Sequence, residues 1–193
     1  MKWCKIVLST LLLLCSGSVL ADWQLDNEQS TISFISIKKH EIAEAHSFNQ
    51  LSGAISETGL ATVEIDLSSV NTSIEIRDTR MKDMLFNVAT YPKTTISSQL
   101  EQDFLDKLKV GDVHHLTLPI TVTMHGTSQA YDSEVLIVYV NDKQLIVSAV
   151  TPLLVNASDF GFDDGIAKLT EIAGLPHISK AVPVSFVLTF GLE

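Results

Sequence analysis

The sequence predicts an all-β protein, an extended antiparallel eight-stranded barrel with one or two short helices near the barrel ends. Most segments alternate apolar and polar residues with a period of two, which is typical of strands with one buried face. Several of these runs exceed the usual strand length of about 5–6 residues, which favours a barrel over a sandwich. About eight such runs fit the chain, and a closed barrel of eight strands is wide enough to hold one small ligand.

The N-terminal 21 residues have the pattern of a signal peptide. Lys2 and Lys5 supply a basic start, residues 6–14 are apolar, and Val19-Leu20-Ala21 is a small-residue cleavage site. The apolar run is shorter than the roughly 20 residues that span a membrane. Cys15 raises the alternative of a lipoprotein, but Leu14 stands where a small residue is expected, so cleavage after Ala21 is favoured. Residues 1–21 are therefore predicted to be removed in a periplasmic protein.

The remaining residues, 22–193, are expected to form a single domain, because no linker, repeat or low-complexity tract divides them. Both cysteines, Cys4 and Cys15, would leave with the signal peptide, so no disulfide or thiol chemistry is expected. The net charge of −10 becomes −12 once Lys2 and Lys5 are removed, since 11 basic and 23 acidic residues remain. Such a charge argues against nucleic acid as a partner, and against an anionic membrane surface unless a local basic rim contacts it.

The strands are expected in chain order and are separated by turn residues. Strands are predicted at residues 23–26, 31–37, 61–67, 115–124, 131–139, 145–155 and 182–190, with a strand and turn at 53–59. Turns are predicted at Asn27-Glu28-Gln29, His125-Gly126-Thr127 and Asn141-Asp142.

A change of period between residues 78 and 92 predicts a helix. Apolar residues recur at i, i+3, i+4 and i+7, namely at Met81, Met84, Leu85 and Val88. Asp78 is the expected N-cap, and Tyr91-Pro92 is expected to end the helix, because the residue before proline is pushed out of the helical region. The helix should cover one end of the barrel. Further short helices are predicted around residues 104–108 and 166–173.

Several of these residues also form a motif. Asn71-Thr72, Arg77-Asp78, Met81, Leu85-Phe86 and Tyr91-Pro92 match, in order and spacing, a signature of the YceI-like, polyisoprenoid-binding domain. The sequence resembles that family over nearly all of residues 22–193, and residues 116–127 and 156–161 resemble further family landmarks. The resemblance implies a lipocalin-like barrel that holds a long isoprenoid chain inside it.

Two positions depart from the family pattern. Leu85 replaces the first of two phenylalanines, and His46 stands where a glycine is usual. A bulky side chain at position 46 could narrow or reshape one end of the cavity. The departure affects the identity of the ligand more than the fold.

Aromatic and methionine side chains are the candidates for the lining of the cavity. They are Phe34, Phe48, Met81, Met84, Leu85, Phe86, Met124, Phe160 and Phe186. The same residue types could equally fill a packed core, and only the family resemblance favours a lined cavity. Arg77, Asp78 and His46 are candidates for a headgroup or a structural role, and Arg77 is expected to be paired with a carboxylate.

No catalytic or metal site is predicted. Adjacent His114 and His115 would point to opposite faces of a strand, and the Asp163-Asp164-Gly165 turn lacks further calcium ligands. No motif of a hydrolase or a phosphate-binding loop is present. We therefore expect no enzyme and no cofactor other than a bound isoprenoid lipid or quinone.

The predicted function is that of an exported carrier or store for an isoprenoid lipid, quinone or similar amphiphile. The alternative is a non-catalytic periplasmic accessory barrel with a filled interior that acts through a protein partner. No stable membrane span is expected. The sequence leaves open a homodimer, the headgroup and chain length of the ligand, and the physiological partner.

Overall fold

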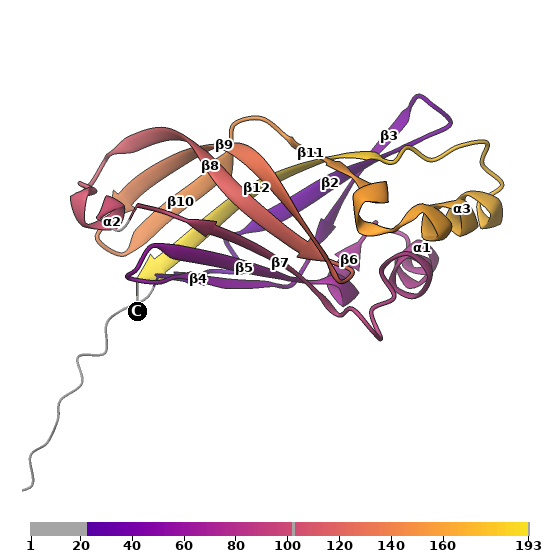
Figure 1. Cartoon of the computed structure of the whole chain (residues 1–193), viewed down its shortest axis with the longest axis horizontal. Helices are drawn as coiled ribbons and strands as arrows, with labels where there is room; N and C mark the ends of the chain where they lie inside the picture. The colour runs from indigo at the N-terminus through magenta and orange to yellow at the C-terminus, as the bar shows by residue number, and fades with distance from the viewer. Residues whose placement is uncertain (1–22, 102, 193) are drawn as a thin grey trace, which may run out of the picture.

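The computed structural model describes residues 23–101 and 103–192, whose strands form one sheet that closes into an elongated barrel (Figure 1). The strands are β1 (Trp23–Leu25), β2 (Thr31–Lys38), β3 (Ile42–Phe48), β4 (Leu51–Ile55), β5 (Leu60–Asp66), β6 (Val70–Asn71), β7 (Lys93–Gln99), β8 (Val113–Met124), β9 (Thr127–Asn141), β10 (Gln144–Ala149), β11 (Leu153–Asn156) and β12 (Ala181–Leu192). The helices are η1 (Leu67–Ser69), α1 (Glu75–Arg80), η2 (Met81–Phe86), α2 (Phe104–Lys107), η3 (Ala157–Phe160) and α3 (Asp163–Ile172).

The barrel is closed by the short first strand. β1 pairs with both β4 and β12, which completes a ring of the eight strands β1, β4, β5, β7, β8, β9, β10 and β12. Each pairing in this ring is antiparallel. The predicted fold class, an eight-stranded antiparallel barrel with short helices near its ends, is confirmed.

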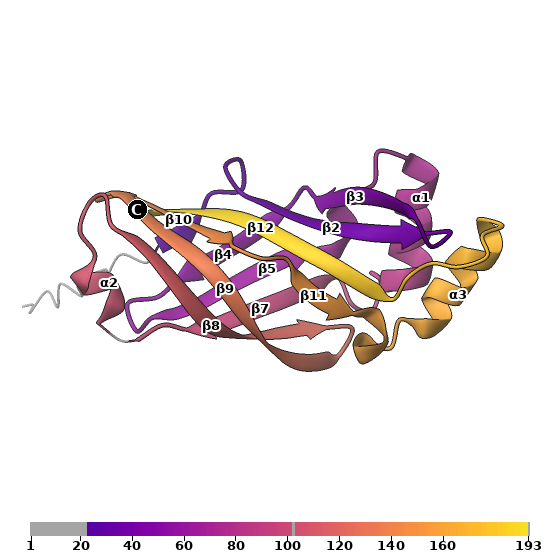
Figure 2. The ribbon, with the colours of Figure 1, turned by 90° about the horizontal axis from the view of Figure 1, so that it is seen from above.

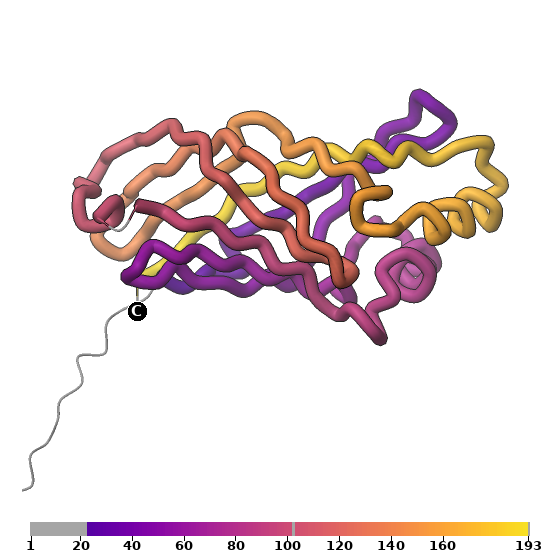
Figure 3. The backbone as a smooth tube through the Cα atoms, in the orientation of Figure 1, coloured from indigo at the N-terminus to yellow at the C-terminus, as the bar shows by residue number. Residues whose placement is uncertain are grey.

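One end of the barrel is prolonged by additional strands. The second half of β12 pairs with β10 and β1, whereas its first half pairs with β2 and β11. β2 continues into the β2–β3 hairpin, and β3 pairs with β6. Figures 1 and 2 show this hairpin together with α1 and α3 at one end of the molecule, and α2 at the opposite end. The backbone tube in Figure 3 follows the same long axis.

The interior holds two clusters of buried apolar side chains, stacked along the barrel axis. The cluster toward α2 is built around Trp23, Ile55, Leu145 and Phe190. The cluster toward α1 and α3 is built around Leu67, Phe86, Phe160, Phe162 and Ile166. Each large apolar side chain removed from water contributes about 1.5–3 kcal/mol, so these clusters are the main source of stability.

The helix after β6 differs from the prediction at both ends. It begins at Glu75 rather than at Asp78, and its N-cap is Ile74. From Met81 to Phe86 it continues as a π-helix, and it ends at Asn87, a residue with φ 48°. Tyr91 does not end the helix. Its ring packs instead on His125, in the turn between β8 and β9, with ring centroids 4.3 Å apart.

The remaining elements agree with the sequence in most places. α2, α3 and the His125-Gly126 turn lie where they were predicted, and both turn residues have the positive φ that a tight hairpin requires. The predicted strand at 145–155 is divided into β10 and β11 by a bend at residues 150–152. β3, β7 and the two-residue β6 were not predicted. Among the described residues, no helix is both long and apolar enough to cross a membrane.

Candidate ligand-binding cavity

A cavity of about 480 Å³ runs through the interior of the barrel. Its walls are formed by the inward-facing side chains of the long strands, and most of them are apolar. Representative lining residues from both core clusters are Ile32, Val63, Ile96, Ile120, Val135, Ile137, Val184 and Leu188. The interior therefore contains a lined cavity rather than a filled core.

The end of the cavity near α2 is closed. Its last lining residues, Leu100, Leu145 and Phe190, are almost fully buried. Phe104, Leu105 and Leu108, from α2 and the residue after it, pack against this cluster. This end of the cavity is therefore lined mainly by apolar side chains.

The opposite end is open and carries charge. Every charged residue that lines the cavity lies there, on the β2–β3 hairpin or on α1, namely Lys38, Glu44, Arg77 and Arg80. Antiparallel pairing in the hairpin sets Phe34 opposite His46, and Ser36 opposite Glu44. Because paired residues share a face of the sheet, the inner face changes from aromatic to polar toward the opening, which we call the mouth. An amphiphile with an apolar tail and a polar headgroup fits this gradient.

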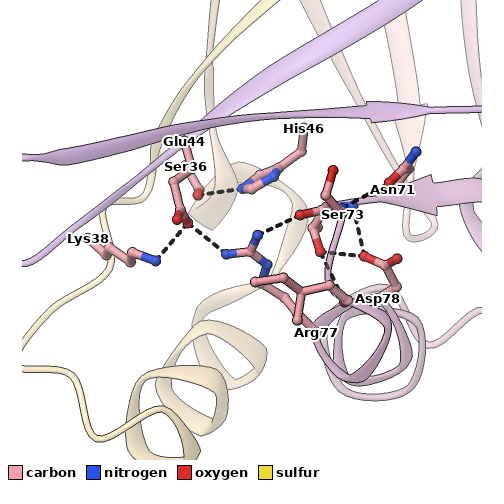
Figure 4. A network of polar contacts seen from close by, with 10 residues as sticks. Ser36, Lys38, Glu44, His46, Asn71, Ser73, Arg77 and Asp78 are labelled. Atoms are coloured by element: carbon pink, nitrogen blue, oxygen red, sulfur yellow. Dashed lines mark hydrogen bonds and ion pairs between the residues drawn. The ribbon is translucent and has the colours of Figure 1, made fainter.

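Arg77 connects α1 to the hairpin across the mouth (Figure 4). One guanidinium nitrogen donates to the Glu44 carboxylate at 2.6 Å, and the other donates to the backbone oxygen of Thr72 at 2.7 Å. Lys38 also donates to Glu44, at 2.7 Å. The hydrogen bond from Lys38 is the main cause that lowers the pKa of the Glu44 carboxyl, and Arg77 adds to it. The carboxylate is therefore ionised and paired with two cations, as predicted for Arg77.

Asp78 fixes the segment before the helix rather than capping its first turn. Its carboxylate accepts hydrogen bonds from the backbone N–H of Thr72, at 2.8 Å, and from the Thr72 hydroxyl. Asp78 does not line the cavity. The prediction that Asp78 is the N-cap is wrong, because the helix has already begun at Glu75 and the free N–H group that needs an acceptor belongs to Thr72.

His46 lies deeper in the cavity wall and is only 5% exposed. Its Nε2 shares a hydrogen bond of 2.8 Å with the Ser36 hydroxyl, and its ring packs against Phe34 with centroids 5.2 Å apart. Nδ1 has no hydrogen-bond partner among the described residues. Burial is the main cause that lowers the pKa of His46, and the charge of Arg77 adds to it, so the ring is neutral at pH 7.

Most of the predicted lining residues do line the cavity. They are Phe34, Phe48, Met81, Leu85, Phe86, Met124 and Phe186. Met84 and Phe160 do not, since Met84 is exposed and Phe160 is buried within the core cluster beside the cavity. Sequence reasoning missed Ser36, Lys38, Glu44 and Arg80. The alternation along 31–38 gives the inward parity of Ser36 and Lys38, and could have found them.

The histidines do not form a metal site in the described parts of the chain, where no group of three potential ligands is present. His40 and His177 stack with ring centroids 5.1 Å apart, at the tip of the β2–β3 hairpin and in the segment after α3. The proposed binding roles of the lining residues stay predictions.

A comparison with family models matches residues 23–190 to the YceI-like domain. The chain belongs to the YceI-like domain family. The match extends over almost all of the described barrel, including the three strands that sequence patterns missed. A comparison with curated proteins found no match.

Several solved structures are similar to this YceI-like domain. A polyisoprenoid-binding domain from Saccharophagus degradans, implicated in plant cell wall breakdown, is 36% identical, with a TM-score of 0.86. The alignment covers 89% of this chain and 98% of that one. BcnA from Burkholderia cenocepacia is 19% identical over 86% of this chain and 98% of its own, with a TM-score of 0.66. The YceI protein of Campylobacter jejuni is 17% identical over 77% and 84%, with a TM-score of 0.55. The last two likenesses concern the fold alone.

Proposed function

We propose that this YceI-like protein carries or stores an amphiphilic lipid, with the apolar chain in the barrel and the headgroup at the mouth. The observation that carries the proposal is the cavity itself: it is long, mostly apolar, closed near α2 and charged only at the mouth. Burial of an apolar chain contributes about 0.8 kcal/mol for each CH₂ group, which is enough to hold a long chain without specific contacts. The name of the Saccharophagus degradans domain makes an isoprenoid lipid or a quinone the first candidate.

We propose that the protein binds its ligand without catalysing a reaction. Most of the polar groups at the mouth are already engaged with one another, because Glu44 pairs with Lys38 and Arg77, and His46 pairs with Ser36. Within residues 23–101 and 103–192, the cavity wall holds one hydroxyl beside a base, Ser36 with His46, but His46 Nδ1 has no hydrogen-bond partner to orient the ring as a general base. Glu44 is the only carboxylate among the lining residues, so a pair of carboxylates is absent there too. The arrangement supports binding of a molecule that leaves unchanged.

We propose that the protein is located in the periplasm. This rests on residues 1–21, which lie outside the described residues and have the pattern of a signal peptide. The intact mass of protein recovered from a periplasmic extract should correspond to a chain that begins at Asp22. A mass that includes Cys15 would mean that export follows another route.

The ligand is identified by extraction. Protein purified from its own source is extracted with organic solvent, and the extract is analysed by mass spectrometry. We expect one lipid class with an isoprenoid chain, in an amount comparable with the amount of protein. An extract with no lipid beyond that of a matched control protein would contradict the proposal, and would favour the accessory barrel that acts through a protein partner.

A further inference from the structure

The β2–β3 hairpin ends in an exposed isoleucine beside the mouth. Ile42 pairs with Lys38 across the hairpin, so both side chains lie on the inner face of the sheet. Lys38 lines the cavity, whereas Ile42 lies beyond it toward the tip and is 43% exposed. An apolar side chain therefore stands at the outer edge of the charged mouth.

Two further isoleucines lie at the mouth, on α1 and α3. Ile76 is one helical turn before Arg80, which lines the cavity, so the two side chains share a face of α1. Ile172 lies three residues after Leu169, another lining residue, so the two side chains share a face of α3. Their exposed fractions are 57% and 44%. Ile42, Ile76 and Ile172 thus border the mouth from three separate elements, and we call them the apolar rim.

The charge of the protein is distributed unevenly along the barrel axis. Residues 38–44, 75–86 and 163–180, which form the hairpin, the α1–η2 helix and the α3 region, contain seven basic and eight acidic residues. Their net charge is −1, which leaves −11 of the −12 of residues 22–193 on the rest of the barrel. An acidic body with one nearly neutral end approaches a lipid surface most favourably with that end first.

We propose that the apolar rim docks on the surface of a lipid bilayer, and that the lipid chain passes between bilayer and cavity through this contact. The inference rests on the proposed function, because a cavity for a lipid has to be loaded. An isoprenoid chain that left the bilayer through water would expose its whole length. Docking of the mouth replaces that exposure with a continuous apolar path, and the rim side chains enter the boundary between headgroups and acyl chains.

The docking is tested by flotation with phosphatidylcholine vesicles. The rim variant carries Ile42→Gln, Ile76→Gln and Ile172→Gln. The matched control carries Leu60→Gln, Val110→Gln and Val113→Gln, at residues that are 46%, 58% and 56% exposed and lie away from the mouth. We expect wild type and control to float with the vesicles, and the rim variant to lose at least tenfold in the floated fraction. Circular dichroism of all three proteins checks that each variant is folded.

The route of transfer is tested with a fluorescently labelled isoprenoid bound to each protein. If the mouth contacts the bilayer, the rate of transfer rises in proportion to the concentration of acceptor vesicles. If the chain crosses water instead, the rate is set by dissociation from the protein and does not depend on the vesicles. We expect the first behaviour for wild type and control, and a rate at least tenfold lower for the rim variant.

Three results would overturn the inference. Wild type that stays at the bottom of the gradient, or a rim variant that floats like the control, excludes docking through the rim. A rim variant that floats normally but loses an oligomeric state in light scattering shows that the rim binds a second copy of the chain. Flotation needs no bound lipid, so a failure of the proposed function, in which no protein binds the labelled isoprenoid, is distinguished from a failure of docking.

Discussion

Arg77 of α1 and Glu44 of β3 are joined by a hydrogen-bonded ion pair of 2.6 Å across the mouth of the barrel. The two residues are 33 positions apart in the chain, and each side chain is partly exposed, at 25% and 33%. Because Arg77 also donates to the backbone oxygen of Thr72, its position is fixed by the protein itself, without a ligand.

Arg77→Ala is therefore expected to lower stability more than ligand binding. It removes hydrogen bonds of a charged group, each of which is worth about 1.5–3 kcal/mol, and partial exposure favours the lower part of that range. Urea unfolding should show this loss, while affinity for a labelled isoprenoid changes less than about threefold. The control is Arg80→Ala, since Arg80 lines the cavity but makes no ion pair among the described residues. An Arg77→Ala protein that melts like wild type, yet binds tenfold more weakly, would assign Arg77 to the headgroup.

The buried ring of His46 is expected to make stability depend on pH. Its pKa is lowered in the folded protein, so the unfolded chain binds the proton more readily. The neutral ring therefore contributes fully to the free energy of unfolding above the pKa of about 6.5 that histidine has in the unfolded chain. This contribution is lost as the pH falls from there through the pKa of the folded protein. The pKa of Glu44 is also lowered, so its contribution to stability is lost at a more acidic pH, below the ordinary glutamate pKa of about 4.3.

The measurement compares wild type with His46→Gln in urea at about pH 7.5 and about pH 5.5. Wild type should lose more free energy of unfolding than His46→Gln on going to the lower pH. Equal losses in the two proteins would show that other groups cause the acid dependence.

Gly165 in α3 lies against the π-helix η2. A Cβ atom at this position would be 2.7 Å from the backbone oxygen of Met84 and 3.1 Å from Leu85 Cα. Replacing a glycine within a helix by alanine ordinarily stabilises by about 1 kcal/mol. Here the overlap with backbone atoms reverses the sign, and we expect Gly165→Ala to destabilise by about 1–3 kcal/mol. Thermal unfolding decides the sign, and a raised melting temperature would mean that α3 and η2 separate easily.

The π-helical geometry of η2 explains why part of the helix was predicted incorrectly. The sequence pattern at residues 81–88 assumes 3.6 residues per turn and brings Met81, Met84 and Leu85 to one face. A π-helix has i→i+5 hydrogen bonds, so Met81 shares its face with Phe86 as well, and both are buried while Met84 is exposed. No sequence pattern signals this local change of period.

Alternation of apolar and polar residues was sufficient to predict a strand where the alternation is regular. β8 and β12 alternate over most of their length and were predicted, whereas β7 has the sequence Lys-Thr-Thr-Ile-Ser-Ser-Gln, in which only one residue is apolar. It is a strand because β5 and β8 pair with it on both sides. The roles of Phe186 and Phe160 illustrate a second limit, because the first lines the cavity and the second fills the core, although their residue type is the same.

The central claim is that the lipid occupies the barrel, and two substitutions on β12 test it. Val184 lines the cavity, whereas Val187 lies on the outer face of the same strand and is exposed. Val184→Phe should fill the path of the chain, and Val187→Phe should leave that path open. Both proteins are purified from their own source, and the mass of the intact complex is measured by native mass spectrometry. We predict a lipid adduct on wild type and Val187→Phe, and none on a folded Val184→Phe protein. An adduct of equal occupancy on both variants would show that the lipid binds outside the cavity.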